Sequence, residues 1–331
     1  MNGACGTTAC AIRAIGVHLP SGSVPSAALE QRLGLEAGWI EQRTGIRSRW
    51  HVPAGCASSD LAALAVRAAV ANAGVPDDSI DLLVCATCTA DMVLPSTACW
   101  THRALGWRPI PAFDVAATCA GFLYAMQMAA GLLAAGFHRR IAVVAAETMS
   151  HHLDPHDKQC GVLFGDGAAA AIVEAEGWLR LLDSQLGADG SLAELITIPA
   201  GGTRRPASAA TLAEGGHCLR MNGREVFRQA VDHMVGSVRR MLATWSLSLA
   251  DIAWVVPHQA NARIAEAVAE RLQLPREKLV LDMSDLGNTA GATIPLALER
   301  ARPRMRRGER VLVTTFGAGA TWGCQLYEVM A

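Results

Sequence analysis

The chain has 331 residues, a formal net charge of −1 and ten cysteines. This near-neutral charge argues against a nucleic acid or a membrane surface as a general partner. The cysteines are irregularly spaced, which fits reduced thiols in the cytoplasm better than a disulfide framework. Met1–Cys10 lacks the charged and then apolar pattern of a secretion signal, and the length suits two similar halves better than one core.

The apolar runs and the turn residues between them predict strands that alternate with helices. The expected strands are Ala11–Leu19, Ile80–Cys88, Pro111–Ala117, Arg140–Glu147 and Gly167–Glu174. The expected helices are residues 26–34, Ser58–Ala73 with Gly74 as its stop, a helix opened by Leu94-Pro95-Ser96 that ends near Leu105, Cys119–Phe137, and Arg224–Ala243. Trp39–Arg47 is expected to be a surface loop, and the polar stretch Gly187–Gly216 to be irregular. This pattern predicts an α/β fold.

The stretch 111–137 is interpreted as a strand that runs directly into a helix, with Cys119 at the joint. Only Gln127 is clearly polar in this helix, and a helix that is apolar all round must be buried on all sides. A membrane span of this length is excluded because three glycines interrupt the stretch and strands flank it closely. Free N–H groups at a helix start favour negative charge, so we expect the Cys119 thiol to ionise readily and to act as a nucleophile.

The second half of the chain repeats the first. Three landmarks recur at nearly one separation: strand Ile80–Cys88 at Ile252–Ala260 after 172 residues (252 − 80), the Cys119 joint at Asn288 after 169 (288 − 119), and strand Arg140–Glu147 at Arg310–Gly317 after 170 (310 − 140). The repeat indicates an internal duplication of a βαβαβ unit, with halves 1–176 and 177–331. Two such halves place two central helices back to back and bring strand ends to one shared site.

Three candidate catalytic residues fall at the ends of predicted strands. Cys119 lies in the first half, whereas His258 and Asn288 follow adjacent strands of the second half. A lone histidine or asparagine is usually structural. The near-twofold relation between the halves, however, brings all three toward one centre.

Six short motifs occur in order along the chain: Asp114–Phe122, Phe164–Gly167, Met221–Phe227, Pro257–Asn261, Gly287–Thr289 and Phe316–Gly323. Together they resemble the motifs of the β-ketoacyl-acyl carrier protein synthase III family, condensing enzymes of the thiolase-like superfamily. The resemblance covers nearly the whole chain. It implies a thiolase-like fold, in which the two duplicated βαβαβ halves form a five-layered αβαβα architecture.

The resemblance also implies a mechanism. Cys119 takes an acyl group from acyl-coenzyme A, and the backbone N–H groups of Cys119 and Ala318 hold the oxyanion. His258 and Asn288 then donate hydrogen bonds to the thioester carbonyl of malonyl-acyl carrier protein, which stabilises the enolate formed as carbon dioxide leaves. The enolate attacks the acyl-cysteine and gives 3-oxoacyl-acyl carrier protein. No metal and no cofactor is expected, because acyl-coenzyme A is itself the substrate.

Binding residues follow from the same resemblance. The positions that contact coenzyme A are Trp39, Arg43 and Lys158; those that face the carrier protein are Arg228, Arg263 and Arg271; and those of the acyl pocket are Leu94 and Ala320. Leu94 stands where many members have a phenylalanine that reaches across a homodimer. Leucine and alanine in place of aromatic residues predict a changed acyl pocket.

Other ligand patterns are weak. Cys85 and Cys88 form a C-x-x-C in a predicted buried strand, with no second pair to complete a zinc site. The acidic and histidine residues of 151–157 lack the separation that structural metal sites usually have. Phe316–Gly323 is glycine-rich but no βαβ unit follows it, which excludes a dinucleotide site.

Three other functions were weighed against condensation. An acyltransferase of the same fold would move the acyl group to an oxygen or nitrogen acceptor. A biosynthetic thiolase would need a second cysteine near Phe316–Gly319, and a silent scaffold predicts the loss of a catalytic residue. Intact His258 and Asn288 favour condensation. The acyl chain, the carrier protein, and the choice between fatty-acid and secondary-metabolite initiation stay open.

Overall fold

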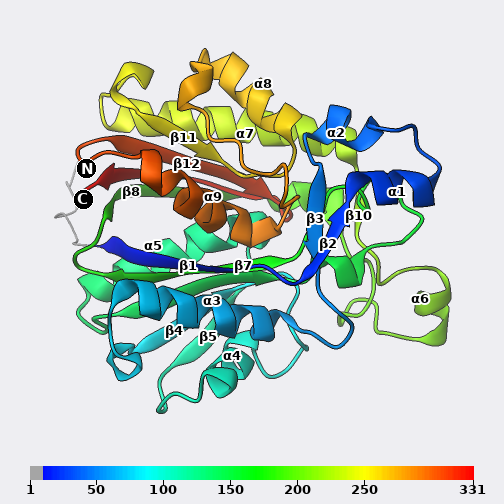
Figure 1. Ribbon diagram of the computed structural model, residues 1–331, viewed down its shortest axis with the longest axis horizontal. Coiled ribbons are helices and arrows are strands. Elements are labelled where there is room, and N and C mark those ends of the chain that lie inside the picture. The colour runs from blue at the N-terminus through cyan, green and yellow to red at the C-terminus, as the bar shows by residue number, and fades with distance from the viewer. Residues whose placement is uncertain (1–9) are drawn as a thin grey trace.

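The computed structural model describes residues 10–331, so the expectation about a signal in Met1–Cys10 lies outside the described residues except for Cys10. In this part of the chain, nine strands hydrogen-bond in the order β11-β12-β13-β8-β1-β7-β6-β4-β5. β1 and β8 pair over only two residues of each strand. The sheet therefore divides there into two parts, which Figure 1 shows as two layers.

The first part of the sheet carries the first half of the chain. Its strands from the edge inward are β5 (Ala112–Val115), β4 (Leu82–Ala86), β6 (Ile141–Glu147), β7 (Gly167–Glu174) and β1 (Ala11–His18). α3 (Ser58–Ala73) and α4 (Thr97–Leu105) cover its outer face (Figure 1). A Cβ on Gly16 of β1 would lie 2.0 Å from the backbone nitrogen of Ala69, so only glycine lets α3 approach this closely.

The second part of the sheet repeats this arrangement. Its strands are β8 (Leu179–Ala188), β13 (Thr321–Val329), β12 (Arg310–Gly317) and β11 (Trp254–Pro257). α7 (Gly223–Thr244) and α8 (Ala262–Leu272) cover the face that points away from the first part (Figure 1).

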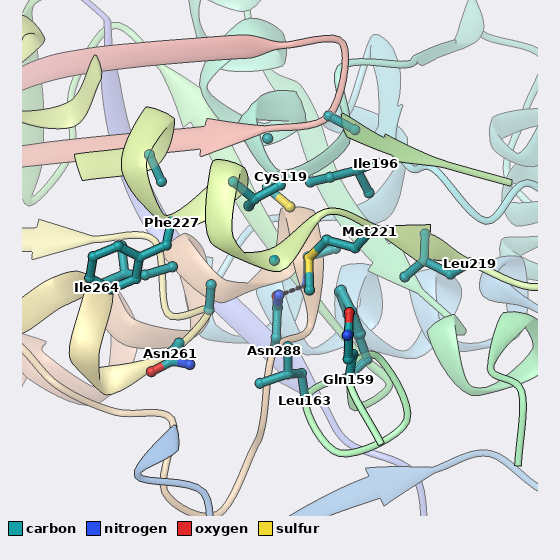
Figure 2. Close-up of a pocket in the computed structure, with 18 of the residues that line it drawn as sticks. Cys119, Gln159, Leu163, Ile196, Leu219, Met221, Phe227, Asn261, Ile264 and Asn288 are labelled. Atoms are coloured by element: carbon teal, nitrogen blue, oxygen red, sulfur yellow. Dashed lines mark hydrogen bonds between the residues drawn. The ribbon is translucent and has the colours of Figure 1, made fainter. Parts of the chain in front are cut away.

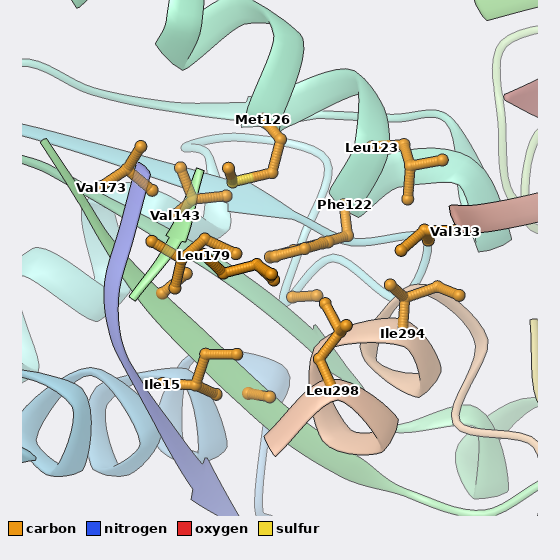
Figure 3. Packing of buried hydrophobic residues seen from close by; sticks show 14 of the residues in the cluster. Ile15, Phe122, Leu123, Met126, Val143, Val173, Leu179, Ile294, Leu298 and Val313 are labelled. Atoms are coloured by element: carbon orange, nitrogen blue, oxygen red, sulfur yellow. The ribbon is translucent and has the colours of Figure 1, made fainter. Parts of the chain in front are cut away.

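A middle layer of two helices separates the two parts. α5 (Gly121–Ala134) and α9 (Thr293–Ala301) both contact strands of the two sheet parts. Figure 3 shows Phe122 and Met126 of α5 packed with Ile294 and Leu298 of α9 among side chains of both parts. The predicted five-layered αβαβα architecture of two duplicated halves is thus confirmed. None of the helices within residues 10–331 has the length and apolar character that a bilayer span requires.

Smaller elements surround the mouth and the edges of these layers. They are β2 (Gly22–Pro25), α1 (Ser26–Leu33), α2 (Trp39–Thr44), β3 (Ser48–His51), β9 (Ile196–Thr197), α6 (Ala209–Ala213) and β10 (Arg220–Met221). The single 3₁₀ turns are η1 (Asp77–Ser79), η2 (Thr118–Ala120), η3 (Met149–His152), η4 (Gly190–Leu195), η5 (Leu249–Asp251), η6 (Arg276–Lys278), η7 (Ala290–Ala292) and η8 (Arg302–Arg304).

Three local predictions need correction. The stretch Gly187–Gly216 is not irregular throughout, because η4, β9 and α6 lie within it. Trp39–Thr44 of the predicted loop Trp39–Arg47 form the helix α2, and Glu30 holds its start by accepting hydrogen bonds from the backbone N–H groups of Gly38 and Ile40. The helix predicted from Cys119 begins at Gly121, since residues 118–120 form a 3₁₀ turn. Long-range contacts decide where α2 and α5 begin, and such contacts cannot be recognised from a local sequence pattern.

The internal duplication is confirmed, but Cys119 does not correspond to Asn288 in the repeat. The helices α5 and α9 begin 172 residues apart (293 − 121), which is also the separation of the strands β4 and β11 (254 − 82). The counterpart of Cys119 is therefore Gly291, and Asn288 precedes that position. The boundary between residues 176 and 177 falls in the turn between β7 and β8, and the division into two domains there stays a prediction.

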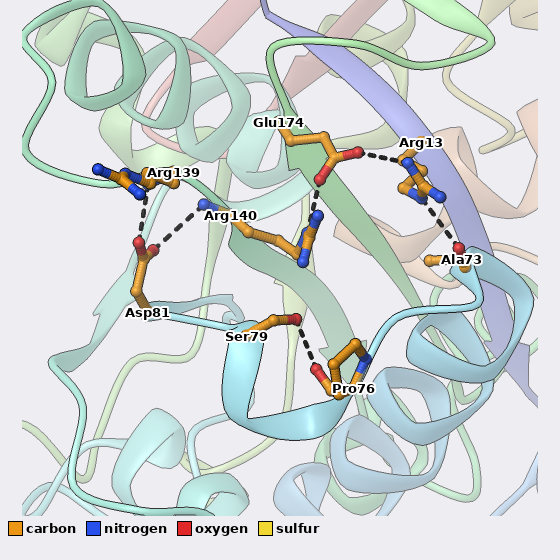
Figure 4. Close-up of polar contacts among 8 residues, drawn as sticks. All are labelled: Arg13, Ala73, Pro76, Ser79, Asp81, Arg139, Arg140 and Glu174. Atoms are coloured by element: carbon orange, nitrogen blue, oxygen red, sulfur yellow. Dashed lines mark hydrogen bonds and ion pairs between the residues drawn. The ribbon is translucent and has the colours of Figure 1, made fainter.

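Ion pairs secure the end of the first sheet part that lies away from Cys119. Glu174, the last residue of β7, accepts from Arg13 at 2.8 Å and from Arg140 at 2.5 Å (Figure 4). Asp81 accepts from the backbone N–H groups of Arg139 and Arg140 just before β6. These contacts join β1, β6 and β7, and leave the opposite strand ends free to form a site.

Candidate active site

A cavity of about 640 Å³ opens where the central parallel strands of both sheet parts end. Cys119, His258 and Asn288 all line it, so the structure brings together the three residues that the sequence singled out. Figure 2 shows Cys119 and Asn288 at this cavity together with Met221 and Phe227. Ligands of α/β sheets usually bind at such carboxyl strand ends.

The backbone around Cys119 is held by contacts from the second half of the chain. Thr118 has a φ of 46° and its hydroxyl donates to the carbonyl of Ala318 at 3.1 Å. Thr315 donates to the carbonyl of Cys119 at 3.0 Å. A Cβ on Gly317 would lie 2.9 Å from the Cys119 nitrogen, so a glycine is required for β12 to come this close. Cys119 and Ala318 therefore lie side by side at the cavity wall.

The electrostatics of Cys119 differ from the expectation of a readily ionised thiol. Burial raises the pKa of the Cys119 thiol to about 12, and the charge of Glu147 adds to the rise, whereas a backbone hydrogen bond opposes it. The backbone N–H groups at the start of the helix lower the pKa of the thiol by less than burial and the nearby carboxylate raise it. In the free protein the thiol needs a partner that accepts its proton.

Glu147 is a buried carboxyl that sequence reasoning did not single out. It accepts from Thr89 Oγ1 at 2.9 Å, from the Cys88 nitrogen at 3.1 Å and from Cys88 Sγ at 3.3 Å. Burial raises the pKa of Glu147 to about 7, although these hydrogen bonds oppose the rise. Cys88 itself lines the cavity, so the C-x-x-C contributes one thiol to the cavity wall and one to the strand β4.

His258 follows β11 and is 4% exposed. Its Nδ1 lies 2.7 Å from Thr293 Oγ1, and its backbone N–H donates to the carbonyl of Thr314 at 2.8 Å. Burial lowers the pKa of His258 to about 3, so the ring is neutral near pH 7. Within residues 10–331, Nε2 has no hydrogen-bond partner.

Asn288 has its amide fixed by the turn that follows it. Its Oδ1 accepts the backbone N–H of Ala290 at 2.9 Å. Its own backbone is bonded to the loop of the first half, from its N–H to the carbonyl of Leu163 at 2.9 Å and from Gly165 to its carbonyl at 3.0 Å. Because the amide oxygen is occupied, the NH₂ group remains as the donor toward the cavity.

The residues expected at coenzyme A lie at the same cavity. Trp39, Arg43 and Lys158 all line it, and the Arg43 guanidinium stacks 4.5 Å from the centre of the Trp39 ring. Their role in binding stays a prediction.

The arginines expected to face the carrier protein lie on α7 and α8. Arg263 lines the cavity and donates to the carbonyl of Gln42. Arg228 and Arg271 are exposed, and both pair with Asp232. These two cations are thus partly neutralised in the free chain, and a contact with an acidic carrier protein must compete with Asp232.

The two residues assigned to the acyl pocket do not line the cavity of their own chain. Leu94 is 81% exposed, next to the exposed Met92 and Val93. Ala320 is buried behind the cavity wall, because it exchanges backbone hydrogen bonds of 2.9 Å with Asp189 at the end of β8.

Sequence analysis did not assign the apolar residues of the cavity wall to a site, although several of them lie in the predicted strand 80–88, the predicted helix 224–243 or the motif 221–227. These wall residues include Cys88, Met149, Ile196, Ile198, Leu219, Met221, Val226, Phe227, Ala230 and Met234. The repeating apolar face of α7 could have indicated its share of this wall. In residues 10–331 no group of three or more histidine, cysteine or acidic side chains is arranged to hold a metal ion.

Comparison with known proteins identifies the family. Family models for 3-oxoacyl-(acyl-carrier-protein) synthase III match residues 113–190 and, for its C-terminal part, residues 242–329. β-Ketoacyl-(acyl-carrier-protein) synthase III 3 of Streptomyces coelicolor is 42% identical over 96% of this chain and 96% of its own. The synthase III of Roseiflexus castenholzii is 41% identical over 94% of this chain and 96% of its own.

The structures agree with this likeness. The crystal structure of 3-oxoacyl-(acyl carrier protein) synthase III from Pseudomonas aeruginosa PAO1 superposes with a TM-score of 0.89 at 37% identity and covers 98% of this chain and 99% of that one. Fold and site thus define a transferase of the thiolase-like condensing class. The chain belongs to the 3-oxoacyl-(acyl-carrier-protein) synthase III family.

Family membership confirms the prediction made from the six motifs. The function that it supports is the condensation of an acyl-coenzyme A primer with malonyl-acyl carrier protein, and the acyltransferase alternative is not favoured.

Proposed function

We propose that this chain catalyses the decarboxylative condensation of an acyl-coenzyme A with malonyl-acyl carrier protein, through an acyl group on Cys119. The observation that carries the proposal is the meeting of Cys119, His258 and Asn288 at one cavity of about 640 Å³. The reaction uses no cofactor, since the thioesters bring their own activated carbonyl groups. The reduced cysteines of the chain fit a cytoplasmic enzyme.

The chemistry follows from what each group can donate. The Cys119 sulfur attacks the acyl-coenzyme A carbonyl, and the N–H groups of Cys119 and Ala318 stabilise the oxyanion. Coenzyme A leaves as the thiol. The malonyl thioester carbonyl then receives hydrogen bonds from the Asn288 NH₂ group and from Nε2–H of His258. Carbon dioxide leaves, and the enolate carbon displaces the Cys119 sulfur from the acyl group.

The test separates the two half-reactions. Wild type, His258→Ala and Asn288→Ala are mixed with acyl-coenzyme A donors of increasing length, and the acylated cysteine is mapped by mass spectrometry. Carbon dioxide release from malonyl-acyl carrier protein is then measured. Asn288→Ala should lower release by about a hundredfold and leave acylation nearly intact, because its donor serves only the enolate. Transfer of the acyl group to an amine or alcohol without carbon dioxide release would instead support the acyltransferase alternative.

We also infer that two chains form a homodimer along β5. This strand is one of the two edges of the nine-stranded sheet, and an unpaired edge readily adds a strand from another copy. Asp114 of β5 accepts the Thr97 and Ala98 N–H groups at 2.7 Å and so anchors α4 beside the exposed loop 92–94. Leu94, 81% exposed in one chain, is then free to reach the acyl pocket of its partner.

Leu94→Phe tests this arrangement. A larger side chain in the partner's pocket should lower acylation by octanoyl-coenzyme A more than by acetyl-coenzyme A. Each buried methylene contributes about 0.8 kcal/mol, so the ratio of the two rates should change by about tenfold. Leu212→Phe is the matched control, because Leu212 is also exposed but belongs to the distant α6. A monomer in solution, or an unchanged ratio, contradicts the inference.

A further inference from the structure

His258 has to accept a proton in one half-reaction and donate one in the other. Acylation requires that the Cys119 thiol lose its proton, and burial holds the pKa of that thiol at about 12. Among the other titratable residues that line the cavity, Arg43, Lys158 and Arg263 are cations. Cys88 is itself a protonated thiol, since burial raises its pKa well above the usual range. Glu147, whose charge also acts on Cys119, does not line the cavity, which leaves His258 as the acceptor for the thiol proton.

The hydrogen bonds of Thr293 indicate which nitrogen of His258 carries the ring proton. A threonine hydroxyl has one proton to donate. Thr293 Oγ1 donates it to the carbonyl of Ala290 at 3.0 Å. The same oxygen lies 2.7 Å from His258 Nδ1, so Nδ1 is the donor of that second bond. A neutral ring with a proton on Nδ1 presents the lone pair of Nε2 to the cavity.

This hydroxyl is not essential to the helix that carries it. The carbonyl of Ala290 also accepts the backbone N–H of Thr293, so it keeps a partner when the hydroxyl turns away. Thr293 is 2% exposed at the first position of α9. The hydroxyl can therefore turn between two positions, and the difference between them is about one hydrogen bond.

We propose that Thr293 is a positioning residue that sets the tautomer of His258, as an acceptor from Nδ1–H during acylation and as a donor to Nδ1 during condensation. The inference deepens the proposed function and rests on it. In acylation Nε2 takes the proton of Cys119 as its sulfur bonds the acyl carbon. Nε2 then gives that proton to the coenzyme A sulfur when the carbon–sulfur bond breaks.

The ring exchanges its proton between the half-reactions. When coenzyme A leaves, water enters the cavity and gives a proton to Nε2; the ring then releases its Nδ1 proton to water, and the hydroxyl of Thr293 turns to donate to Nδ1. The proton now on Nε2 makes the hydrogen bond to the malonyl thioester carbonyl. His258 is neutral before and after the exchange, which agrees with the low pKa that its burial imposes.

Thr293→Val removes the hydroxyl with little change in shape, and Thr293→Ser keeps it as the matched control. Without the hydroxyl, a proton on Nδ1 is buried and unpaired, so the ring proton moves to Nε2, which faces the cavity. Acylation should then fall by about a hundredfold, the usual scale of a lost general base. Carbon dioxide release from malonyl-acyl carrier protein should stay within about threefold of wild type. Thr293→Ser should retain both rates.

The tautomer itself is read by long-range ¹H–¹⁵N NMR of protein labelled in histidine, with His258→Asn used to assign the signal. Wild type and Thr293→Ser should show a protonated Nδ1, and Thr293→Val a protonated Nε2. A protonated Nε2 in free wild type overturns the inference, as does an equal loss of both rates in Thr293→Val with an unchanged melting temperature. Because the NMR measurement needs no turnover, it tests Thr293 even if the proposed condensation fails.

Discussion

The two joints of the middle layer follow one backbone plan and differ in what faces them. In each, a 3₁₀ turn leads into a central helix, and the turn begins with a residue of positive φ, 46° at Thr118 and 44° at Ala290. These two residues are 172 positions apart (290 − 118), as are the starts of α5 and α9. The duplicated backbone thus offers two equivalent sites, occupied by Cys119 and by Gly291.

The residues at the ends of the neighbouring strands make the two joints different. β12 ends at Gly317, where a Cβ would lie 3.0 Å from the Cβ of Cys119. β6 ends at Glu147, whose Oε1 would lie 3.2 Å from a Cβ on Gly291. Gly317 thus lies against Cys119, and the carboxyl of Glu147 lies against Gly291. One joint has room for a nucleophile and its acyl group, whereas the same space in the other is filled by an acid.

Replacing the nucleophile should give the largest effect. Cys119→Ser should lower acylation by at least about a thousandfold, because a serine hydroxyl has no accessible anion near neutral pH. The measurement is the rate of mass increase with acetyl-coenzyme A. Cys99→Ser, at an exposed position of α4, is the control and should acylate at the wild-type rate. An acyl group found on another cysteine would reject the assignment of Cys119.

The acid at the second joint should make stability depend on pH. The pKa of Glu147 rises from 4.5 to about 7 on folding, so its stabilising contribution is complete below pH 4.5 and is lost as the pH rises to 7. Over this range the free energy of unfolding of wild type should fall relative to Glu147→Gln by about 3 kcal/mol. Urea titrations at several pH values measure the difference. His258 is present in both proteins, so its contribution cancels in the difference between their free energies of unfolding. If this difference does not change with pH, the pKa of Glu147 is not raised.

Exchanging glycine for alanine at the two joints compares them directly. Gly317→Ala places a methyl group 2.6 Å from Thr118 Oγ1 and should displace Cys119, so acylation should fall by about a hundredfold. Gly291→Ala meets its nearest atoms only at 3.2 Å, and the fall should be about tenfold or less. Melting temperatures of both variants show whether they fold. A larger loss in Gly291→Ala would mean that the second joint, and not the first, limits the position of the nucleophile.

The charge of Glu147 should have the smallest effect. Glu147→Gln removes a carboxylate that disfavours the Cys119 thiolate, so alkylation of Cys119 by iodoacetamide at pH 8 should become about tenfold faster. Glu174→Gln changes a carboxyl at the far end of β7 and should leave this rate unchanged. Equal rates in wild type and Glu147→Gln would show that the carboxyl is protonated whenever the thiol reacts.

Sequence alone determined most of the main helices and strands of this protein and its three candidate catalytic residues. The bounds of α3, β7 and β12 were predicted correctly, because capping residues, glycines and continuous apolar runs are local signals. The motifs around Cys119, His258 and Asn288 indicated the family, which the comparisons then confirmed.

Only the tertiary structure decided what surrounds those residues. The contact of Glu147 with Cys88, the bond between Thr293 and His258, and the burial that raises the pKa of Cys119 all join segments that are distant in the sequence. A pKa depends on charge and water within a few ångströms in space, and neither quantity is written in a local pattern. The same reason explains why the cavity wall, and the hydrogen bonds by which Glu30 of α1 holds the start of α2, became visible only in the folded chain.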